Sequence, residues 1–147
     1  MDPSEKSAIA KTWLMRNIGK QRYLRSLERR KNSFTFANIS RYESDGSSRY
    51  DPKENITESK MLEYSEICRM VDDLSDELLS TSLDLLKYID KIPNPDEQAV
   101  LIERYVNLST WEGVAKHVSF SKAHAQRIHG RALQSMYAVL KEEGIVD

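Results

Sequence analysis

The feature of this chain that most constrains its fold is a long apolar repeat in its middle. Across residues 57–91, apolar and small residues recur at alternating steps of three and four. This spacing keeps one stripe on a single side of a helix, which at 1.5 Å per residue is about 50 Å long. Such a helix must bury its stripe against other helices. The stripe comprises Met61, Tyr64, Cys68, Val71, Ser75, Leu78, Ser82, Leu85, Ile89 and Ile92.

A second apolar row flanks this stripe and consists of Ile67, Leu74, Leu79 and Leu86. A stripe of this width predicts that the helix meets more than one partner. Serines within the seam disfavour a parallel coiled coil. We therefore expect the helix to pack against the N-terminal helix and a second copy of the chain. The simplest such arrangement is a dimer that depends on Leu78 and Leu85.

The N-terminal segment, residues 4–31, also has helical periodicity, with a thinner stripe. The stripe consists of Ile9, Trp13, Leu14, Ile18, Leu24 and Leu27. Gly19 is a candidate interruption. Lysine and arginine dominate the rest of the segment. Two interpretations remain open: a solvated helix packed on a neighbour, and a helix that contacts phosphates directly.

Charge is strongly segregated along the chain, although its net value is only −1. Residues 11–31 contain eight basic residues and one acidic residue. Residues 51–103 contain fourteen acidic and five basic residues, and residues 104–141 contain six basic residues and one acidic residue. Counterions are released only where cations meet phosphates, so the local charge decides nucleic-acid binding. Either basic end is therefore a candidate for DNA contact.

Residues 32–57 are rich in Asn, Ser, Asp, Gly and Pro, which predicts a flexible loop. Within them, Phe34, Phe36 and Ile39 alternate, as in a short strand, but packing against a helix is the favoured interpretation. The sequence has no apolar run of the roughly 20 residues that span a bilayer and no signal peptide at its start. We expect no membrane association.

A single cysteine, Cys68, excludes an internal disulfide and favours a cytoplasmic protein. His117, His124 and His129 have no Cys or carboxylate at ligand spacing, so we expect no metal site. His129 is expected to make a polar contact between helices. We find no glycine-rich phosphate loop and no nucleophile motif, and we expect neither a cofactor nor an enzymatic activity.

The C-terminal part begins with a clear helix start at residues 94–97. Asn94 is a typical N-cap, Pro95 suits the first turn, and the acids Asp96 and Glu97 suit the positive end of the helix. Pro93 ends the preceding helix. The new helix is expected to reach about residue 106.

Residues 111–130 predict two helices joined by a tight turn. Ser109 or Thr110 caps the first helix, and Glu112 can complete a capping box. Ser119 and Phe120 make the turn, and Ser121 caps the second helix. The residues expected to face inward are Val114, Ala115, Val118, Ala125, Ile128, Ala132 and Met136. The small Ala115 allows the close crossing that a helix-turn-helix requires.

The outward face of the second helix then carries Lys122, His124, Gln126, Arg127 and Arg131. Side chains of these types read base edges and phosphates from the major groove. The alternative is an ordinary helical hairpin whose basic residues are merely solvated.

Residues 92–136 resemble region 4 of sigma-70-type factors and, more closely, the C-terminal part of phage regulators of the ArpU/RinA type. The matching residues are Pro95, Glu97, Leu101, Arg104, Tyr105, residues 110–112, Val114, Ala115, Phe120, Ser121 and residues 127–133. A looser similarity extends upstream, through the basic helix, the loop and the long acidic helix. It therefore covers most of the chain.

The resemblance implies control of late genes in temperate phages or prophages, by binding promoter DNA, with RNA polymerase as a candidate partner. By position, it implies base reading by Lys122, Ala123, His124, Gln126 and Arg127, with Arg131 on phosphate and Ser121 at the same DNA-facing helix start. Ser119 and Gly113 depart from the pattern, each at a cost of about 1 kcal/mol. Ala123 replaces an acid of sigma factors, so a standard −35 element is a doubtful target.

The expected fold is all-α: a long helical stalk or hairpin followed by a three-helix, sigma-70 region 4-like helix-turn-helix domain. Its parts are a basic N-terminal helix (residues 1–31), a flexible loop (32–57), a long acidic helix (58–92) and the DNA-binding domain (93–147). Two alternatives remain for the function. One is a small terminase-like DNA-packaging subunit, and the other is a module that binds RNA polymerase without touching DNA.

Overall fold

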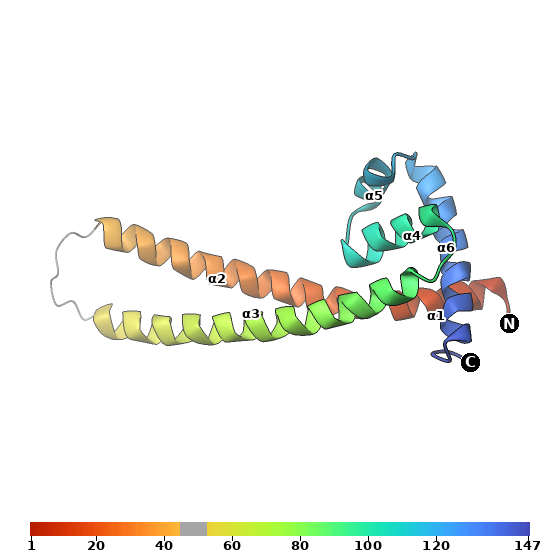
Figure 1. Cartoon of the computed structure of the whole chain (residues 1–147). Helices are drawn as coiled ribbons and strands as arrows, with labels where there is room; N and C mark the ends of the chain where they lie inside the picture. Colours follow the sequence, from red (N-terminus) through yellow and green to blue (C-terminus); the bar gives the residue numbers. More distant parts are fainter. Residues whose placement is uncertain (45–52) are drawn as a thin grey trace. The chain divides into compact units, whose positions relative to one another are not determined.

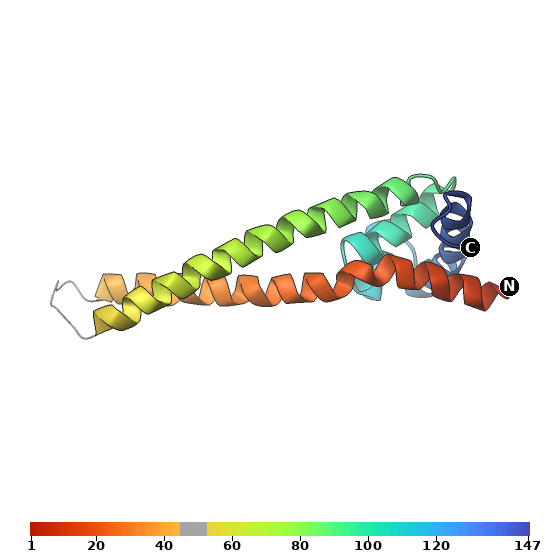
Figure 2. The same cartoon turned by 90° about the horizontal axis from the view of Figure 1, so that it is seen from below.

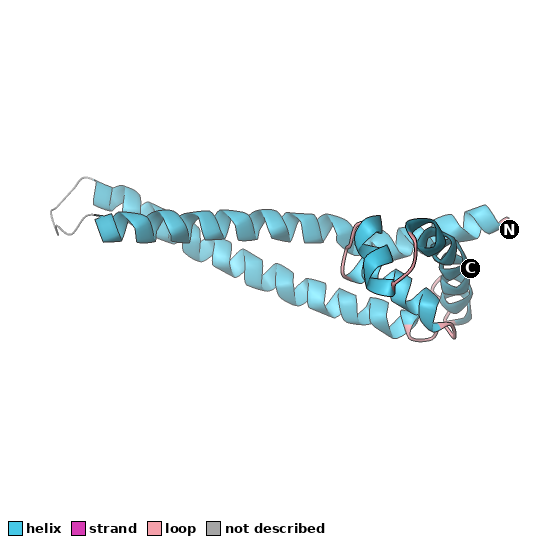
Figure 3. Cartoon of the chain, turned by 90° about the horizontal axis from the view of Figure 1, so that it is seen from above, coloured by secondary structure: helices cyan, strands magenta, loops and turns pink. Residues whose placement is uncertain are grey.

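The computed structural model describes residues 1–44 and 53–147, with the side chains of residues 1–34 and 58–147. All regular structure in these residues is helical, which confirms the all-α class (Figure 3). The helices are α1 (Pro3–Leu14), the 3₁₀ turn η1 (Met15–Asn17), α2 (Ile18–Ser44), α3 (Lys53–Ile89), α4 (Pro95–Leu101), the π-helical turn η2 (Ile102–Val106), α5 (Trp111–Val118) and α6 (Lys122–Glu142). None of them is both long and apolar enough to cross a membrane.

The chain forms two compact units, one of residues 1–18 with 79–147 and one of residues 19–78. These boundaries differ from those expected at residues 31, 57 and 92. The basic N-terminal segment is divided, because η1 separates α1 from α2 two residues before Gly19. The long acidic helix is also divided, and its last turns belong to the same unit as the C-terminal helices.

The unit of residues 19–78 is an antiparallel pair formed by α2 and the first part of α3 (Figure 2). Its core consists of Leu24, Phe34, Ile67, Val71 and Leu78. Lys20 pairs with Glu77, and Arg30 Nη2 lies 3.2 Å from Glu63 Oε1. The basic segment thus packs on an acidic neighbour, as the first of its two interpretations proposed.

The loop expected from residue 32 is wrong for residues 32–44, which continue α2, and for residues 53–57, which begin α3. Local composition favours a loop, but the Phe34 side chain is buried in the α2–α3 core and the Arg30 guanidinium stacks over its ring, 4.2 Å from the centroid. Tertiary packing therefore overrides local propensity. The alternative of a short strand is also wrong. Residues 45–52 and the side chains of Phe36 and Ile39 lie outside the described residues.

The other unit has its main core where α1, the end of α3, α4 and α6 meet (Figure 1). Ala10 and Leu14 of α1 are fully buried there, together with Leu85 and Ile89 of α3. The Gln134 amide of α6 donates to the Pro3 carbonyl at 2.7 Å and to Ser7 Oγ at 2.6 Å, which fixes α1 against α6. The start of the chain is thus part of the C-terminal unit.

Helix α4 begins as the sequence predicts, because Asn94 Oδ1 accepts hydrogen bonds from the backbone N–H groups of Asp96 and Glu97. Glu97 has a second role. Its carboxylate is buried and accepts a 2.5 Å hydrogen bond from Ser135 Oγ, which links α4 to α6. The helix ends at residue 106, as expected, but its last turn is the π-helical η2.

The long stripe on α3 meets more than one partner, as its width predicts, with α2 covering its first part and the C-terminal unit its last part. Leu78 and Leu85 are buried within the chain itself, with only 5% and 0% exposure. They were expected to hold a dimer together, and that assignment is wrong. Periodicity reveals that a stripe is buried but not which helix covers it. The leucines that remain exposed on α3 are Leu62, Leu79 and Leu83.

Candidate nucleic-acid interface

Helices α5 and α6 are joined by a turn of three residues. A side chain caps the N-terminus of each helix. Thr110 Oγ1 accepts a hydrogen bond from the Gly113 N–H at 3.2 Å, and Ser121 Oγ accepts one from the His124 N–H at 3.1 Å. Between them, Ser119 adopts a left-handed conformation with φ 60° and ψ 39°. Both caps and the strained turn residue were predicted. The turn therefore fixes where α6 begins.

The capping box predicted for Glu112 is wrong. Thr110, not Ser109, caps α5, so the third helical position is Gly113. Glu112 stands one residue too early for its side chain to accept a hydrogen bond from the N-cap backbone N–H. The Glu112 carboxylate instead reaches across the turn to the first residue of α6. Its Oε1 atom lies 2.9 Å from Lys122 Nζ. This hydrogen bond lowers the pKa of the Glu112 carboxyl below its ordinary value.

The packing around Gly113 supplies a reason for a glycine inside α5. A Cβ atom at this position would lie 3.3 Å from Ser109 Cβ and 3.4 Å from Thr110 Oγ1. The contact with Ser109 Cβ would be tighter than ordinary van der Waals packing. The missing side chain thus lets the segment before α5 fold closely over its first turn, and this offsets part of the helix-propensity cost of glycine.

The inward faces of α5 and α6 form a small core of their own with α4. It contains Val100, Val114, Ala115, Ala125 and Ile128, with Trp111, Val118 and Phe120 packed around it. Ala132 and Met136, one and two turns further along α6, are fully buried in the main core. The predicted inward stripe is confirmed, and it fixes the rotation of α6 about its axis.

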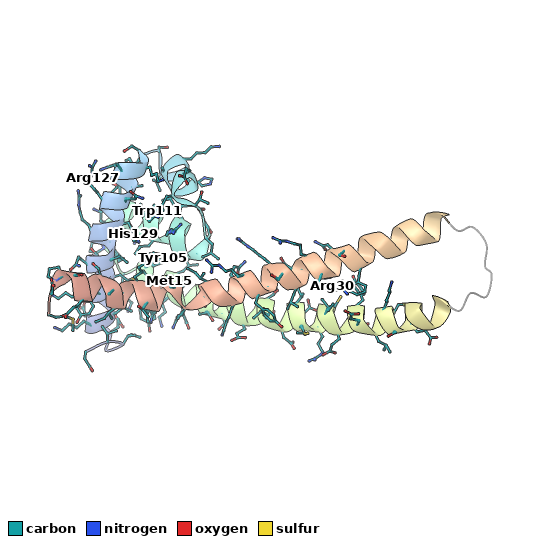
Figure 4. All side chains as sticks on the ribbon, turned by 180° about the vertical axis from the view of Figure 1, so that it is seen from behind. Met15, Arg30, Tyr105, Trp111, Arg127 and His129 are labelled. Atoms are coloured by element: carbon teal, nitrogen blue, oxygen red, sulfur yellow. The ribbon has the colours of Figure 1, made fainter. Side chains whose placement is uncertain are left out.

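The opposite face of α6 is therefore the exposed one. Six of the seven candidate DNA-facing residues are exposed there: Ser121, Lys122, Ala123, Gln126, Arg127 and Arg131. Figure 4 shows Arg127 on the outer side of α6. The seventh, His124, is half-buried, because its ring packs edge-on against Phe120 with 4.7 Å between centroids. We therefore assign His124 to the packing of the turn.

The cations on this face differ in their surroundings. Lys122 is held by Glu112, whereas Arg127 and Arg131 have no ion-pair partner in the described part of the chain. Their guanidinium groups project donors into solvent without a competing carboxylate. Gln126 adds an amide that can donate and accept together. The face thus presents hydrogen-bond donors of the kind that phosphates and base edges accept.

Behind this face, an aromatic cluster joins η2, α5 and α6 (Figure 4). The Trp111 ring packs edge-on against His129, with 4.9 Å between centroids, and the Arg104 guanidinium lies over the Trp111 ring, 4.8 Å from its centroid. Arg104 Nη1 also donates to the Ser109 carbonyl at 3.0 Å. Arg104 thereby ties the segment before α5 to η2, a role that its sequence position did not indicate.

Burial lowers the pKa of His129 to about 4, and the nearby charges of Lys11 and Arg104 act in the same direction. Burial also raises the pKa of Tyr105, whose hydroxyl is hydrogen-bonded to His129, to about 12. Both groups are therefore neutral near pH 7. The polar contact that was expected of His129 between helices is present.

Sequence reasoning missed the contact between Glu112 and Lys122, although one signal was available. The first turn of α6 contains no acid, and a cation at a helix N-terminus is electrostatically unfavourable unless an anion lies close. That imbalance indicates a carboxylate from elsewhere in the chain.

Comparison of the chain with protein-family models, with curated proteins and with solved structures found no match. The resemblance to phage regulators and to sigma region 4 therefore stays a prediction that rests on the residues quoted for it.

Proposed function

We propose that this chain is a sequence-specific, double-stranded DNA-binding regulator of transcription, acting on late genes of a phage or prophage. In this proposal α4, α5 and α6 form a helix-turn-helix domain of the sigma-70 region 4 type. Helix α6 enters the major groove, and α5 crosses the phosphate backbone. Such a protein needs no catalytic group.

One observation carries the proposal: Gln126 and Arg127, in the first two turns of α6, keep their side chains out of the packing. Ala125 and Ile128 hold the helix from behind, at 0% and 4% exposure. Gln126 and Arg127, between them in sequence, are exposed. In a recognition helix it is this N-terminal part that reaches base edges. Any amphipathic surface helix alternates in this way. What favours DNA reading is that the exposed positions near the helix start carry an amide and a guanidinium, the groups that pair with base edges.

The chemistry of each side chain suits a different part of the duplex. Gln126 can form paired hydrogen bonds with adenine, and Arg127 can do so with guanine through its planar guanidinium. Arg131 lies one turn further from the start of α6. That far from the helix start, a guanidinium is better placed to contact a phosphate than a base edge. These three residues therefore combine sequence reading with non-specific attraction.

The test is binding to duplex DNA over a range of salt from about 50 to 200 mM. The logarithm of the affinity should fall steeply and linearly with the logarithm of salt concentration. Replacing Arg131 by Ala should reduce that slope by about one unit, and should weaken binding to all sequences alike. Fluorescence anisotropy with labelled duplexes measures both quantities.

The matched control is Lys141→Ala, which removes one exposed positive charge from the last turn of the same helix. It should leave the slope almost unchanged, since Lys141 is far from the start of α6. An affinity that does not depend on salt, or equal effects of the two variants, contradicts the proposed interface. The module that binds RNA polymerase without DNA then becomes the better explanation.

A further inference from the structure

Glu112 and Lys122 form an ion pair at the place where DNA would enter. Glu112 is the second residue of α5 and Lys122 is the first residue of α6, so their contact bridges the turn between the two helices. The Nζ–Oε1 distance is 2.9 Å, and the side chains are 54% and 72% exposed for Lys122 and Glu112 respectively. The pair is therefore solvated and free to open.

The position of Lys122 is unfavourable for the helix that carries it. Unpaired backbone N–H groups give the N-terminus of a helix a partial positive charge, and acidic residues usually occupy the first turn. Helix α6 has no acid in its first turn and begins with a lysine. Glu112 supplies the missing negative charge from α5. An arrangement that breaks a local rule at an exposed surface indicates a functional residue.

We infer that Glu112 is a specificity-determining residue, which keeps Lys122 away from the phosphates of random DNA and releases it only to a base with well-placed acceptors. The inference rests on the proposed DNA-binding function. Its ligand is a base pair that offers two acceptors in the major groove, as guanine does with O6 and N7. Lys122 and Glu112 thus act as a unit.

The physical basis is competition between anions for one ammonium group. On random DNA a phosphate must displace the Glu112 carboxylate and also lie close to it, so like-charge repulsion offsets the attraction. On a matching sequence the neutral acceptors of guanine carry no such repulsion. Discrimination then arises from weakened binding to the wrong sequences, which is a common route to specificity. The pair lowers non-specific affinity more than specific affinity.

The experiment measures the binding of the full chain to random duplex DNA in a salt series. Glu112→Gln keeps the size of the side chain and removes its charge. It should bind random duplex about 3–10-fold more tightly. Its salt slope should be steeper by about one unit, as one additional phosphate contact would give. The matched control is Glu142→Gln, an equal charge change at the exposed far end of α6, which should have little effect.

A double variant separates release of Lys122 from a general effect of charge. In the Lys122→Ala background, Glu112→Gln should lose most of its gain in affinity for random duplex, because no ammonium remains to be released. Glu112→Ala serves as a second variant of the same kind. Circular dichroism melting of each variant should show a folded protein, since both side chains are more than half exposed.

The possible outcomes distinguish the two proposals. If the unmodified protein binds duplex with a steep salt slope but Glu112→Gln behaves like Glu142→Gln, the inference is overturned and the DNA-binding function stands. An equal gain in the presence and absence of Lys122 also overturns it, because the effect would then be the charge of Glu112 alone. If the unmodified protein binds no duplex at low salt, the proposed function fails and the inference fails with it.

Discussion

The Tyr105 hydroxyl oxygen lies 2.6 Å from Nε2 of His129, and this contact joins η2 to α6 behind the exposed face. The two rings also stack, with 5.7 Å between their centroids and 26° between their planes. Because the contact is partly buried, a charge on His129 would have to be accommodated beside Arg104 and Lys11. Protonation of His129 is thus unfavourable in the folded protein.

The first prediction is that the folded protein loses stability in acid through His129. Its pKa is lowered from 6.5 to about 4, so the unfolded chain binds more protons between these two values. The free energy of unfolding therefore contains a contribution that is complete above about pH 6.5 and is lost as pH falls toward 4. Urea unfolding at a series of pH values measures this contribution.

His129→Gln should reduce the pH dependence in this window, since an amide does not titrate and can still bond to Tyr105. His117→Gln is the matched control, because His117 is exposed on α5. It should keep the profile of the unmodified protein. Identical profiles for the unmodified protein and His129→Gln would show that His129 does not govern the acid response.

The second prediction concerns the strained turn between α5 and α6. Ser119 has a φ of 60°, in the left-handed region that glycine adopts without steric cost. Ser119→Gly should stabilise the protein by about 1 kcal/mol, because the strain of a side chain there is of that size. Thermal or urea unfolding gives the difference.

Ser121→Ala, only two residues away, should have the opposite effect. It removes the side-chain oxygen that accepts the His124 N–H, at a cost of about 1 kcal/mol. The two variants together distinguish backbone strain from capping. A loss of stability in Ser119→Gly contradicts the first effect and indicates that the serine side chain contributes contacts of its own.

The sequence predicted α6 more completely than any other element. Capping by Ser121 and the spacing of Ala125, Ile128 and Ala132 determine where the helix begins and which face it buries, and both signals are local. The caps Asn94 and Thr110 were predicted for the same reason. Local chemistry therefore accounts for most of the candidate site.

Most of the incorrect predictions depend on contacts between residues distant in sequence. Phe34 lies in a segment of loop composition, yet α3 gives it a buried place, so the helix continues. The capping box is the exception, because it fails locally: Thr110 rather than Ser109 caps α5, and Gly113 then stands at the third helical position. Leu85 has the right spacing for an oligomer seam, but α1 and α6 of the same chain cover it. A pattern in one helix does not identify the partner helix.

The third prediction keeps the expected homo-oligomer and moves its interface to the leucines that α3 leaves exposed. Leu79 and Leu83 are 61% and 57% exposed, and Leu83 borders a shallow hollow that Leu86, Ile89 and Ile102 also line. Contiguous exposed apolar surface marks interaction sites, and we expect these leucines and the hollow to form one such surface. The double change Leu79→Ser and Leu83→Ser should convert a dimer into folded monomers, as measured by analytical ultracentrifugation.

Met61→Ser together with Leu62→Ser is the control, since these residues are 60% and 73% exposed near the other end of α3. The control should remain dimeric. An unmodified protein that is monomeric at tens of micromolar refutes the oligomer altogether. If the control pair gives monomers and the first pair does not, the interface lies near Met61 and Leu62, and its placement at Leu79 and Leu83 is wrong.

The last prediction separates base reading from solvation of a surface helix. Gln126 and Arg127 are exposed in the first two turns of α6, whereas Ala125 beside them is fully buried. Gln126→Ala and Arg127→Ala should therefore keep the helical fold and the melting temperature. Each should lose discrimination of about 1–3 kcal/mol between a preferred duplex and a scrambled one, the size of a paired contact to one base. The preferred duplex is obtained by selection from a random pool with the unmodified protein, and competition binding then measures the ratio of the two affinities.

Arg127→Lys should also lack full discrimination between the two duplexes, because an ammonium lacks the planar pair of donors. Ala125→Gln serves as the contrast, since a polar side chain at a buried site should unfold the domain. If Gln126→Ala and Arg127→Ala keep full discrimination while folded, α6 does not read bases.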